Sequence, residues 1–181
     1  ESDLQHVMTS EETLRRKFAL GNGPVVVFPA ITHPHKNHLF LLNLLTQSSG
    51  PWSDPTLKLV FAGSAGAHEG AVREFISLHS LNDRVVMPGR VSHEDRNGLL
   101  AMADAMAFPS EYEGFGAPVI EAMRLGAPVI ASDKGSLPEV VADAGMVCAL
   151  TVDAWNSALQ DSRTHRSEWV SKGRERAQTF T

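Results

Sequence analysis

The chain has 181 residues, of which 43% are hydrophobic and 20% are charged, and its formal net charge at pH 7 is -5. These values predict one globular domain with a single core and exclude a disordered chain. The negative charge disfavours a general nucleic-acid surface, because binding along a polymer requires a basic stripe. No apolar run reaches the length of a membrane span and no leader pattern is present, so a cytoplasmic setting is expected. The single cysteine, Cys148, excludes an intrachain disulfide and a cysteine zinc cage, and is expected to be a small buried hydrophobe.

The first expected element is a helix from Thr9 to Gly21. Thr9 and Glu12 have the spacing of a capping box, with Thr9 as the capping residue. The apolar face of this helix holds Leu14, Phe18 and Leu20. We therefore divide the domain into a lead-in segment, residues 1–23, and a core, residues 24–181.

Six apolar runs in the core predict six strands. They span residues 24–29, 57–62, 84–88, 105–108, 128–131 and 144–150. Helical patterns separate or follow them at residues 39–45, 68–79, 92–102, 117–125, 133–141, 152–159 and 163–180. In the first of these core helices, the residues expected to face inward are Leu39, Phe40, Leu42 and Leu45. The alternation predicts an α/β fold, a doubly wound parallel sheet in the strand order 3-2-1-4-5-6.

The loop after the fourth strand is the candidate ligand site. Its glycines let a backbone approach a ligand, and the free N–H groups at the start of the next helix suit a phosphate. Glu121, about one turn into the helix, is placed to accept hydrogen bonds from ribose hydroxyls, and Glu113 from a second sugar. The same site includes Ser110, Gly114, Phe115, Gly116, Ala117, Pro118 and Val119. An anion between two polyols describes a nucleotide-sugar.

The stretch PSEYEGFGAPVIEAMRLGAPVIASDKGSLPEV, which begins at Pro109, carries a family resemblance. With its two glutamates separated by seven residues, it resembles the nucleotide-binding, carboxy-terminal half of retaining glycosyltransferases with the GT-B fold, the group-1 or family-4 glycosyltransferases. The resemblance extends over nearly the whole chain. It implies transfer of a hexose, of mannose or glucose type, from a UDP-, GDP- or ADP-sugar to a glycan or lipid-linked acceptor, without a metal or other cofactor.

The resemblance also assigns roles. Lys36 would stabilise the leaving diphosphate and Glu113 would hold the donor sugar, as the catalytic residues. Residues beside the nucleotide would be Gly63, Ser64, Arg90 and Val91. Five positions before Lys36 the family usually has a basic residue, and this chain has Ile31. An amino-terminal acceptor domain, absent here, would supply the acceptor site and any peripheral membrane contact.

Several alternatives remain beside this interpretation. His33, His35 and His38 suggest a zinc site, but no carboxylate accompanies them, so polar loop histidines that cap the helix or touch substrate are expected instead. Paired carboxylates also occur in glycosidases, although the surrounding motif does not suggest hydrolysis. Glu121 could be a carboxylate favoured by the helix dipole. A module that binds nucleotide without turnover stays open, whereas an oxidoreductase is rejected because no glycine fingerprint follows the first strand.

Overall fold

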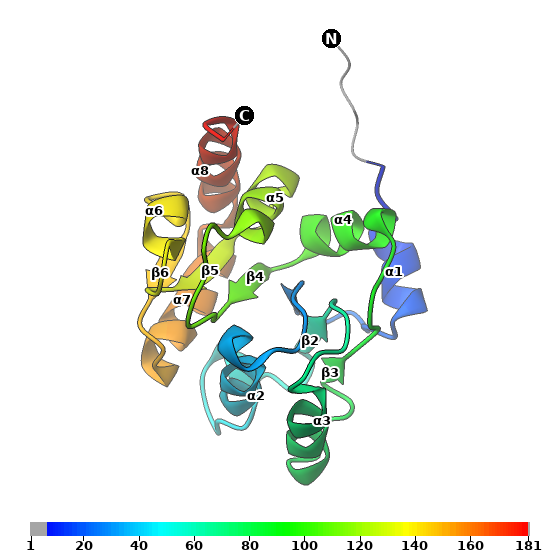
Figure 1. The fold of residues 1–181 in the computed structure, drawn as a ribbon. Coiled ribbons are helices and arrows are strands. Elements are labelled where there is room, and N and C mark those ends of the chain that lie inside the picture. The colour runs from blue at the N-terminus through cyan, green and yellow to red at the C-terminus, as the bar shows by residue number, and fades with distance from the viewer. Residues whose placement is uncertain (1–6, 181) are drawn as a thin grey trace.

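The computed structural model describes residues 7–180; residues 1–6 of the expected lead-in segment, and Thr181, lie outside the described residues. A parallel six-stranded sheet runs through the middle of the molecule (Figure 1). Its order is β3-β2-β1-β4-β5-β6, which confirms the predicted topology. The strands are β1 (Val25–Phe28), β2 (Lys58–Phe61), β3 (Val85–Val86), β4 (Ala105–Phe108), β5 (Val129–Ser132) and β6 (Met146–Cys148).

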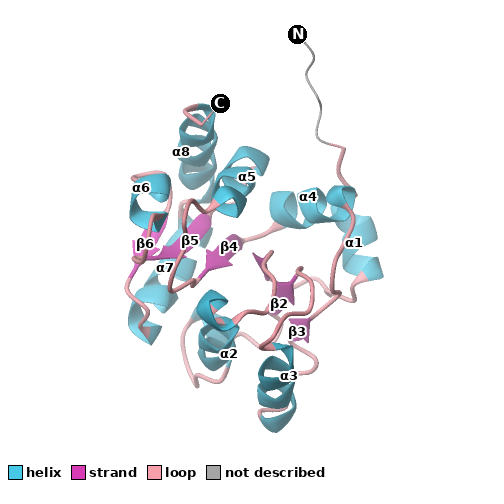
Figure 2. Cartoon of the chain, viewed as in Figure 1, coloured by secondary structure: helices cyan, strands magenta, loops and turns pink. Residues whose placement is uncertain are grey.

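Helices cover both faces of this sheet (Figures 1 and 2). One group consists of α1 (Glu11–Lys17), α4 (His93–Met102), α5 (Ala117–Leu125) and α8 (Arg166–Gln178), in which each helix contacts the next. The other contains α2 (His38–Leu45), α3 (Glu69–Leu78) and α7 (Val152–Thr164), with the short helix η2 (Pro51–Ser53). The short helix η1 (Pro34–Lys36) lies in the loop between β1 and α2. The short α6 (Leu137–Val141) packs beside β5 and β6. Two covered faces explain why the strands are almost continuously apolar.

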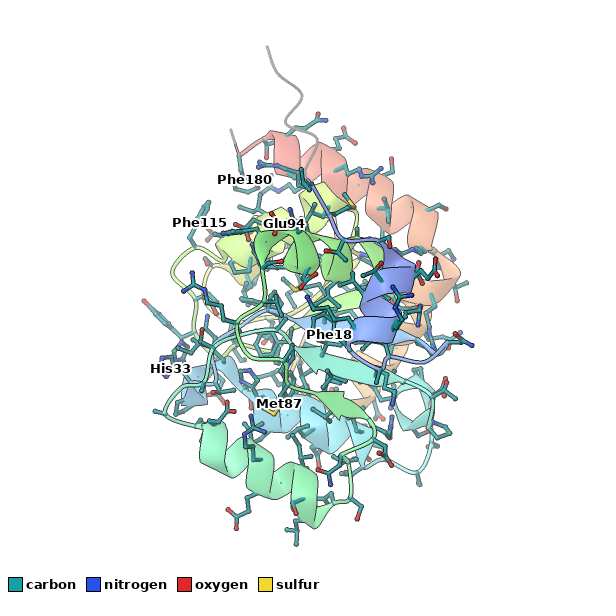
Figure 3. The ribbon with its side chains drawn as sticks, turned by 90° about the vertical axis from the view of Figure 1, so that its right-hand side faces the viewer. Phe18, His33, Met87, Glu94, Phe115 and Phe180 are labelled. Carbon is teal, nitrogen blue, oxygen red and sulfur yellow. The ribbon has the colours of Figure 1, made fainter. Side chains whose placement is uncertain are left out.

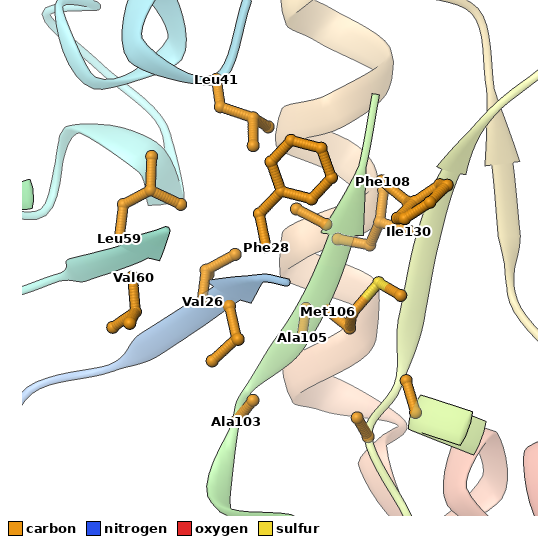
Figure 4. Packing of buried hydrophobic residues seen from close by; sticks show 14 of the residues in the cluster. Val26, Phe28, Leu41, Leu59, Val60, Ala103, Ala105, Met106, Phe108 and Ile130 are labelled. Carbon is orange, nitrogen blue, oxygen red and sulfur yellow. The ribbon is translucent and has the colours of Figure 1, made fainter. Parts of the chain in front are cut away.

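The core is centred on β1, whose four residues are all buried. Phe28 points towards Leu41 of α2 and Phe108 of β4 (Figure 4), and the Phe28 and Phe108 ring centres lie 5.5 Å apart at 87°. Val26 and Val27 pair in register with Ala105 and Met106 of β4. β1 and β4 are therefore adjacent and parallel, although about eighty residues separate them in the chain.

The amino end of α1 differs from the prediction. Ser10, not Thr9, is the capping residue, and its hydroxyl accepts the N–H of Thr13. The Thr9 hydroxyl instead donates to Asp95 of α4 at 2.8 Å. A threonine and a serine in succession are both suitable capping residues. Because the Thr9 hydroxyl is bound to the Asp95 carboxylate, Ser10 is left to cap the helix. At the start of α4, Ser92 is the capping residue, and its hydroxyl accepts the N–H of Asp95.

The boundary between the last two helices was also predicted wrongly. α7 continues beyond Leu159 to Thr164, and α8 begins at Arg166 rather than Arg163. Nothing in the intervening sequence stops a helix, because no glycine or proline is present there. His165 forms the junction, where its N–H donates to the carbonyl of Asp161.

Smaller departures concern strand ends and helix faces. β3 and β6 are shorter than their apolar runs, because only residues paired with β2 and β5 belong to the ladder. In α2, Leu41 and Leu44 are buried, whereas Leu39 and Phe40 are only partly buried. Cys148 is half-buried on β6, and this burial raises the pKa of its thiol. Among residues 7–180, no helix has the length and apolar character required to cross a membrane.

Candidate functional site

The strand order reverses between β1 and β4, because β2 and β3 extend the sheet on one side of this pair and β5 and β6 extend it on the other. The loops after β1 and β4 meet at this point. In open α/β sheets this switch point is where ligands bind, at the carboxyl ends of the strands. The two loops are tied together, because the Glu111 N–H donates to the carbonyl of His35 at 2.8 Å. The switch point therefore carries the loop of residues 29–37 on one side and that of residues 109–116 on the other.

An ion pair joins these loops. The ammonium of Lys36 donates to the Glu113 carboxylate, and their side chains are only 15% and 11% exposed. Lys36 Nζ also lies 5.4 Å from the ring centre of Phe108. The two predicted catalytic residues are thus brought together, at a partly desolvated position where electrostatic interactions are stronger than in water.

The loop after β5 holds the backbone of Glu113 through hydrogen bonds. The N–H and hydroxyl of Ser136 donate to the Glu113 carbonyl, at 3.3 Å and 3.1 Å. Gly135 has a φ of +56°, and a Cβ built there would lie 2.9 Å from the Glu113 nitrogen. Glycine is required at this close approach. The sequence motif after β5 therefore serves to hold Glu113.

A cavity of about 400 Å³ lies at the ends of β2 and β3. All four residues predicted beside the nucleotide line it, namely Gly63, Ser64, Arg90 and Val91. The rest of the lining is Ala62 and Ser92 from the loops and His93 and Arg96 from α4. A Cβ at Gly63 would lie 1.9 Å from the carbonyl oxygen of Ala30, so only glycine lets the loops after β1 and β2 meet this closely. The cavity has basic groups on its wall and could hold a polar, acceptor-rich ligand.

Glu121 projects from α5 towards α4, where its carboxylate pairs with Arg96. It lines a second cavity of about 240 Å³, together with His93, Arg96, Asn97, Arg124 and Leu125. His93 and Arg96 line both cavities, so the two adjoin. The sequence analysis did not select either residue. Their signal would have been a histidine and an arginine in the first turns of the helix after the third strand, which is too common a pattern to single out.

The start of α5 has the geometry expected for an anion. Gly116 has a φ of +80° and Pro118 lies in the first helical turn. The first N–H groups of any helix have no intrahelical partner. Among the described residues, the N–H groups of Gly114, Phe115 and Gly116 also make no backbone hydrogen bond. Gly114 and Phe115 are exposed, so their N–H donors are open to a ligand, whereas Gly116 is buried.

Phe115 projects from this loop and is 55% exposed. Its ring meets that of Phe180, with centres 5.9 Å apart at 77°. Figure 3 shows both side chains, and His33, at the same side of the molecule. The end of the described chain therefore contacts the loop that begins α5.

Some predicted residues are not brought to one place. Among residues 7–180, Lys36 and Glu113 line neither of the two cavities, and the Lys36 pair is separate from the Glu121 pair. Ser110 is fully buried, and its hydroxyl has no hydrogen-bond partner within the described residues. Its role beside substrate stays a prediction.

The loop histidines do not behave as a group. His33 and His35 stack with ring centres 5.9 Å apart. His38 departs from the predicted polar loop residue, because it is fully buried at the start of α2 between the rings of Phe28 and Phe61. Over residues 7–180, no group of three His, Cys, Asp or Glu side chains is arranged to hold a metal. α2 turns His38 inward because Asn37, with a φ of +58°, redirects the chain just before it.

Burial lowers the pKa of His38 to about 4, and the carbonyl of Ala30 opposes part of this shift. The folded state therefore keeps the ring neutral, while an unfolded chain protonates near the ordinary value of 6.5. Between these two pH values the unfolded state binds more protons, so stability is highest above pH 6.5 and falls as the pH drops towards 4.

We expect the free energy of unfolding to be about 2 kcal/mol lower at pH 5 than at pH 7 through His38 alone. Urea denaturation at both pH values measures this difference. His38→Leu removes the titrating group and keeps an apolar side chain, so its pH dependence should be weaker by the same amount. Identical pH dependence in the two proteins would show that another group is responsible.

The fold is that of the Rossmann-like half of a GT-B glycosyltransferase, and the candidate site lies at its switch point. Residues 10–176 match the profile of the family described as glycosyl transferases group 1, and the chain belongs to this family. A curated relative, the alpha-D-kanosaminyltransferase of Streptomyces kanamyceticus, is 24% identical over 112 residues, which are 62% of this chain and 28% of the relative.

Two solved structures extend the comparison. Sucrose-phosphate synthase from Thermosynechococcus elongatus is 26% identical with a TM-score of 0.78, over 96% of this chain and 45% of that protein. The Anabaena protein HepE, solved in complex with UDP and glucose, is 22% identical with a TM-score of 0.82, over 98% of this chain and 50% of HepE. The chain thus spans about half the length of these proteins.

Proposed function

We propose that this chain is the donor-binding domain of a retaining glycosyltransferase. It transfers a hexose of mannose or glucose type from a nucleoside diphosphate sugar to a hydroxyl of a glycan or lipid-linked acceptor. The observation that carries the proposal is the Lys36–Glu113 pair, which joins the two loops of the switch point beside the open start of α5. A cytoplasmic setting and a companion acceptor domain, with any membrane contact made through that domain, belong to the same proposal.

In this proposal the diphosphate lies between Lys36 and the first turn of α5. An ammonium has three N–H donors, so Lys36 can bind a phosphate oxygen while it keeps its contact with Glu113. The negative charge that develops on the leaving diphosphate is stabilised by Lys36 and by the N–H groups before α5. Because these groups supply positive charge where other transferases place a metal, the proposed reaction uses no metal.

Glu113 and Glu121 would contact the two sugars. Glu113, held by the loop after β5, faces the donor hexose and accepts its hydroxyl hydrogens. Glu121 accepts those of the ribose. The cavity lined by Gly63 and Arg90 then receives the base.

The relatives support the binding of a nucleotide-sugar. HepE was solved with UDP and glucose, and the other two proteins are named as a sucrose-phosphate synthase and an alpha-D-kanosaminyltransferase. Because the chain covers about half of each solved relative, the acceptor would be held by another domain.

A nucleotide-binding module without turnover is the second candidate. Ile31, which is exposed beside the switch point, stands where the family usually has a second cation. With Lys36 as the only cation of that motif, binding without transfer is physically reasonable. Product analysis with the full-length protein separates the two functions, because only a transferase forms a glycoside.

Thermal denaturation with UDP, GDP and ADP, each alone and as its sugar, tests the proposal. A ligand at one hundred times its Kd stabilises the folded state by about 2.7 kcal/mol, which should raise the Tm by roughly 5–10 °C for a domain of this size. Inorganic pyrophosphate is the control for simple charge binding. If none of the three diphosphates raises the Tm, the donor-binding function is wrong.

A further inference from the structure

We propose that Arg96 is a positioning residue that orients the Glu121 carboxylate towards the ribose of the donor. This inference rests on the proposed function and adds a residue to it. Arg96 lies on α4 and Glu121 on α5, two helices that are in contact. Their ion pair lies at the boundary of the two cavities, because Arg96 lines both.

The exposures of the two side chains differ in a way that suits this role. Arg96 is 24% exposed and Glu121 is 46% exposed. The arginine, which joins α4 to α5 through this ion pair, is thus the more buried partner, and the carboxylate is the more accessible one. Without the pair, an exposed glutamate samples several rotamers, and fixing one of them on binding costs conformational entropy. The guanidinium of Arg96 therefore holds Glu121 in one orientation before the ligand arrives.

The chemistry leaves a free acceptor. Arg96 contacts the Oε2 oxygen of Glu121. A carboxylate accepts about four hydrogen bonds over its two oxygens, so Oε1 stays available for the hydroxyls of a ribose. A guanidinium remains charged and matches a carboxylate well. The pair is neutral overall, and Glu121 therefore adds no net negative charge next to a bound diphosphate.

The experiment compares each ribonucleoside diphosphate with its 2′,3′-dideoxy analogue by calorimetry. The ratio of the two Kd values reports the hydroxyl contact and is insensitive to the base and the phosphates. In the wild-type protein we expect a ratio of about ten or more, since hydrogen bonds to charged groups are strong. Arg96→Gln and Glu121→Gln should each reduce the ratio to about one or two. The double variant should show no further loss, because both changes remove the same contact.

Two further variants make the test specific. Arg96→Lys keeps the charge but loses the planar fork, so its ratio should be intermediate. Arg124→Gln removes a positive charge from the rim of the second cavity, one turn after Glu121, and leaves Arg96 in place. It can weaken both nucleotides equally, but the ratio should remain that of the wild type.

The outcomes separate the positioning role of Arg96 from the proposed donor-binding function. A wild-type ratio in Arg96→Gln, with a lost ratio in Glu121→Gln, would overturn the positioning role and leave donor binding intact. A ratio near one in the wild type would also overturn it, because Glu121 would then not contact the ribose. If no diphosphate binds at all, the proposed function is wrong, and the positioning role of Arg96, which depends on it, is wrong as well. The pair is partly exposed, so the Tm of the variants should stay within a few degrees of the wild type.

Discussion

Lys36→Met is expected to lower the rate of sugar transfer by about a hundred- to a thousand-fold in the full-length enzyme. In the proposed mechanism Lys36 is the cation that meets the leaving diphosphate, and a partly desolvated site makes its charge effective. Both kcat and the affinity for the nucleoside diphosphate should fall. Initial rates with saturating acceptor measure the first, and calorimetry with the diphosphate measures the second.

Lys134→Met is the matched control. Lys134 follows β5 at the same end of the sheet, but pairs with its neighbour Asp133 and is 49% exposed. Its replacement removes the same charge from the same side of the molecule and should change the transfer rate by less than about threefold, because exposed charges act weakly. Equal losses in the two variants would mean that the overall charge, rather than the position of Lys36, matters.

The fold must be checked separately, because Lys36→Met leaves Glu113 nearly buried without its cation. Removing one partner of a buried pair is destabilising, whereas removing both often is not. The double variant Lys36→Met/Glu113→Gln should therefore recover much of the Tm that Lys36→Met loses. Transfer should remain low in both, which separates stability from catalysis.

Phe28→Ala is expected to reduce the free energy of unfolding by about 3–5 kcal/mol, the largest stability effect that we predict. Phe28 is fully buried on β1, and its ring meets Phe61 and Phe108 on the two neighbouring strands, at 6.2 Å and 5.5 Å between ring centres. Deletion of the ring leaves a cavity beside Leu41 of α2 (Figure 4) and beside the ring of His38. Urea denaturation at pH 7 measures the change.

Phe75→Ala makes the same chemical change on α3. Phe75 is only partly buried, and its ring stacks on His79 at 4.2 Å between centres. Its removal should cost about 1 kcal/mol, since the surroundings are already partly hydrated. Similar losses at Phe28 and Phe75 would show that the core is not centred on β1.

The topology could be predicted because it follows from local patterns that the fold obeys. Continuous apolar runs such as residues 24–29 identify strands covered on both faces, and right-handed crossovers leave few possible orders. Both ends of α5 were also predictable, since Gly116 and Pro118 at its start and Gly126 at its end act through their own backbone preferences. The effect of these residues on the helix does not depend on contacts with distant parts of the chain.

Local cues failed where two of them compete or where a partner is remote. Thr9 and Ser10 are both suitable helix caps. Ser10 is the one that caps, because the Thr9 hydroxyl donates instead to Asp95, which is 86 residues away. The polar sequence around His38 suggested a loop residue, but the turn at Asn37 places the ring in the core.

The sequence by itself determined the class of fold and the strand order, because these depend on periodicity and on glycine and proline, and it predicted the loop at which a ligand would bind. Only the tertiary structure decided which charges meet. Lys36 pairs with Glu113, 77 residues away, because β1 and β4 are neighbours in the sheet. Arg96 pairs with Glu121 because α4 and α5 pack together. Electrostatic contacts depend on distance in space, and that distance exists only once the sheet has assembled.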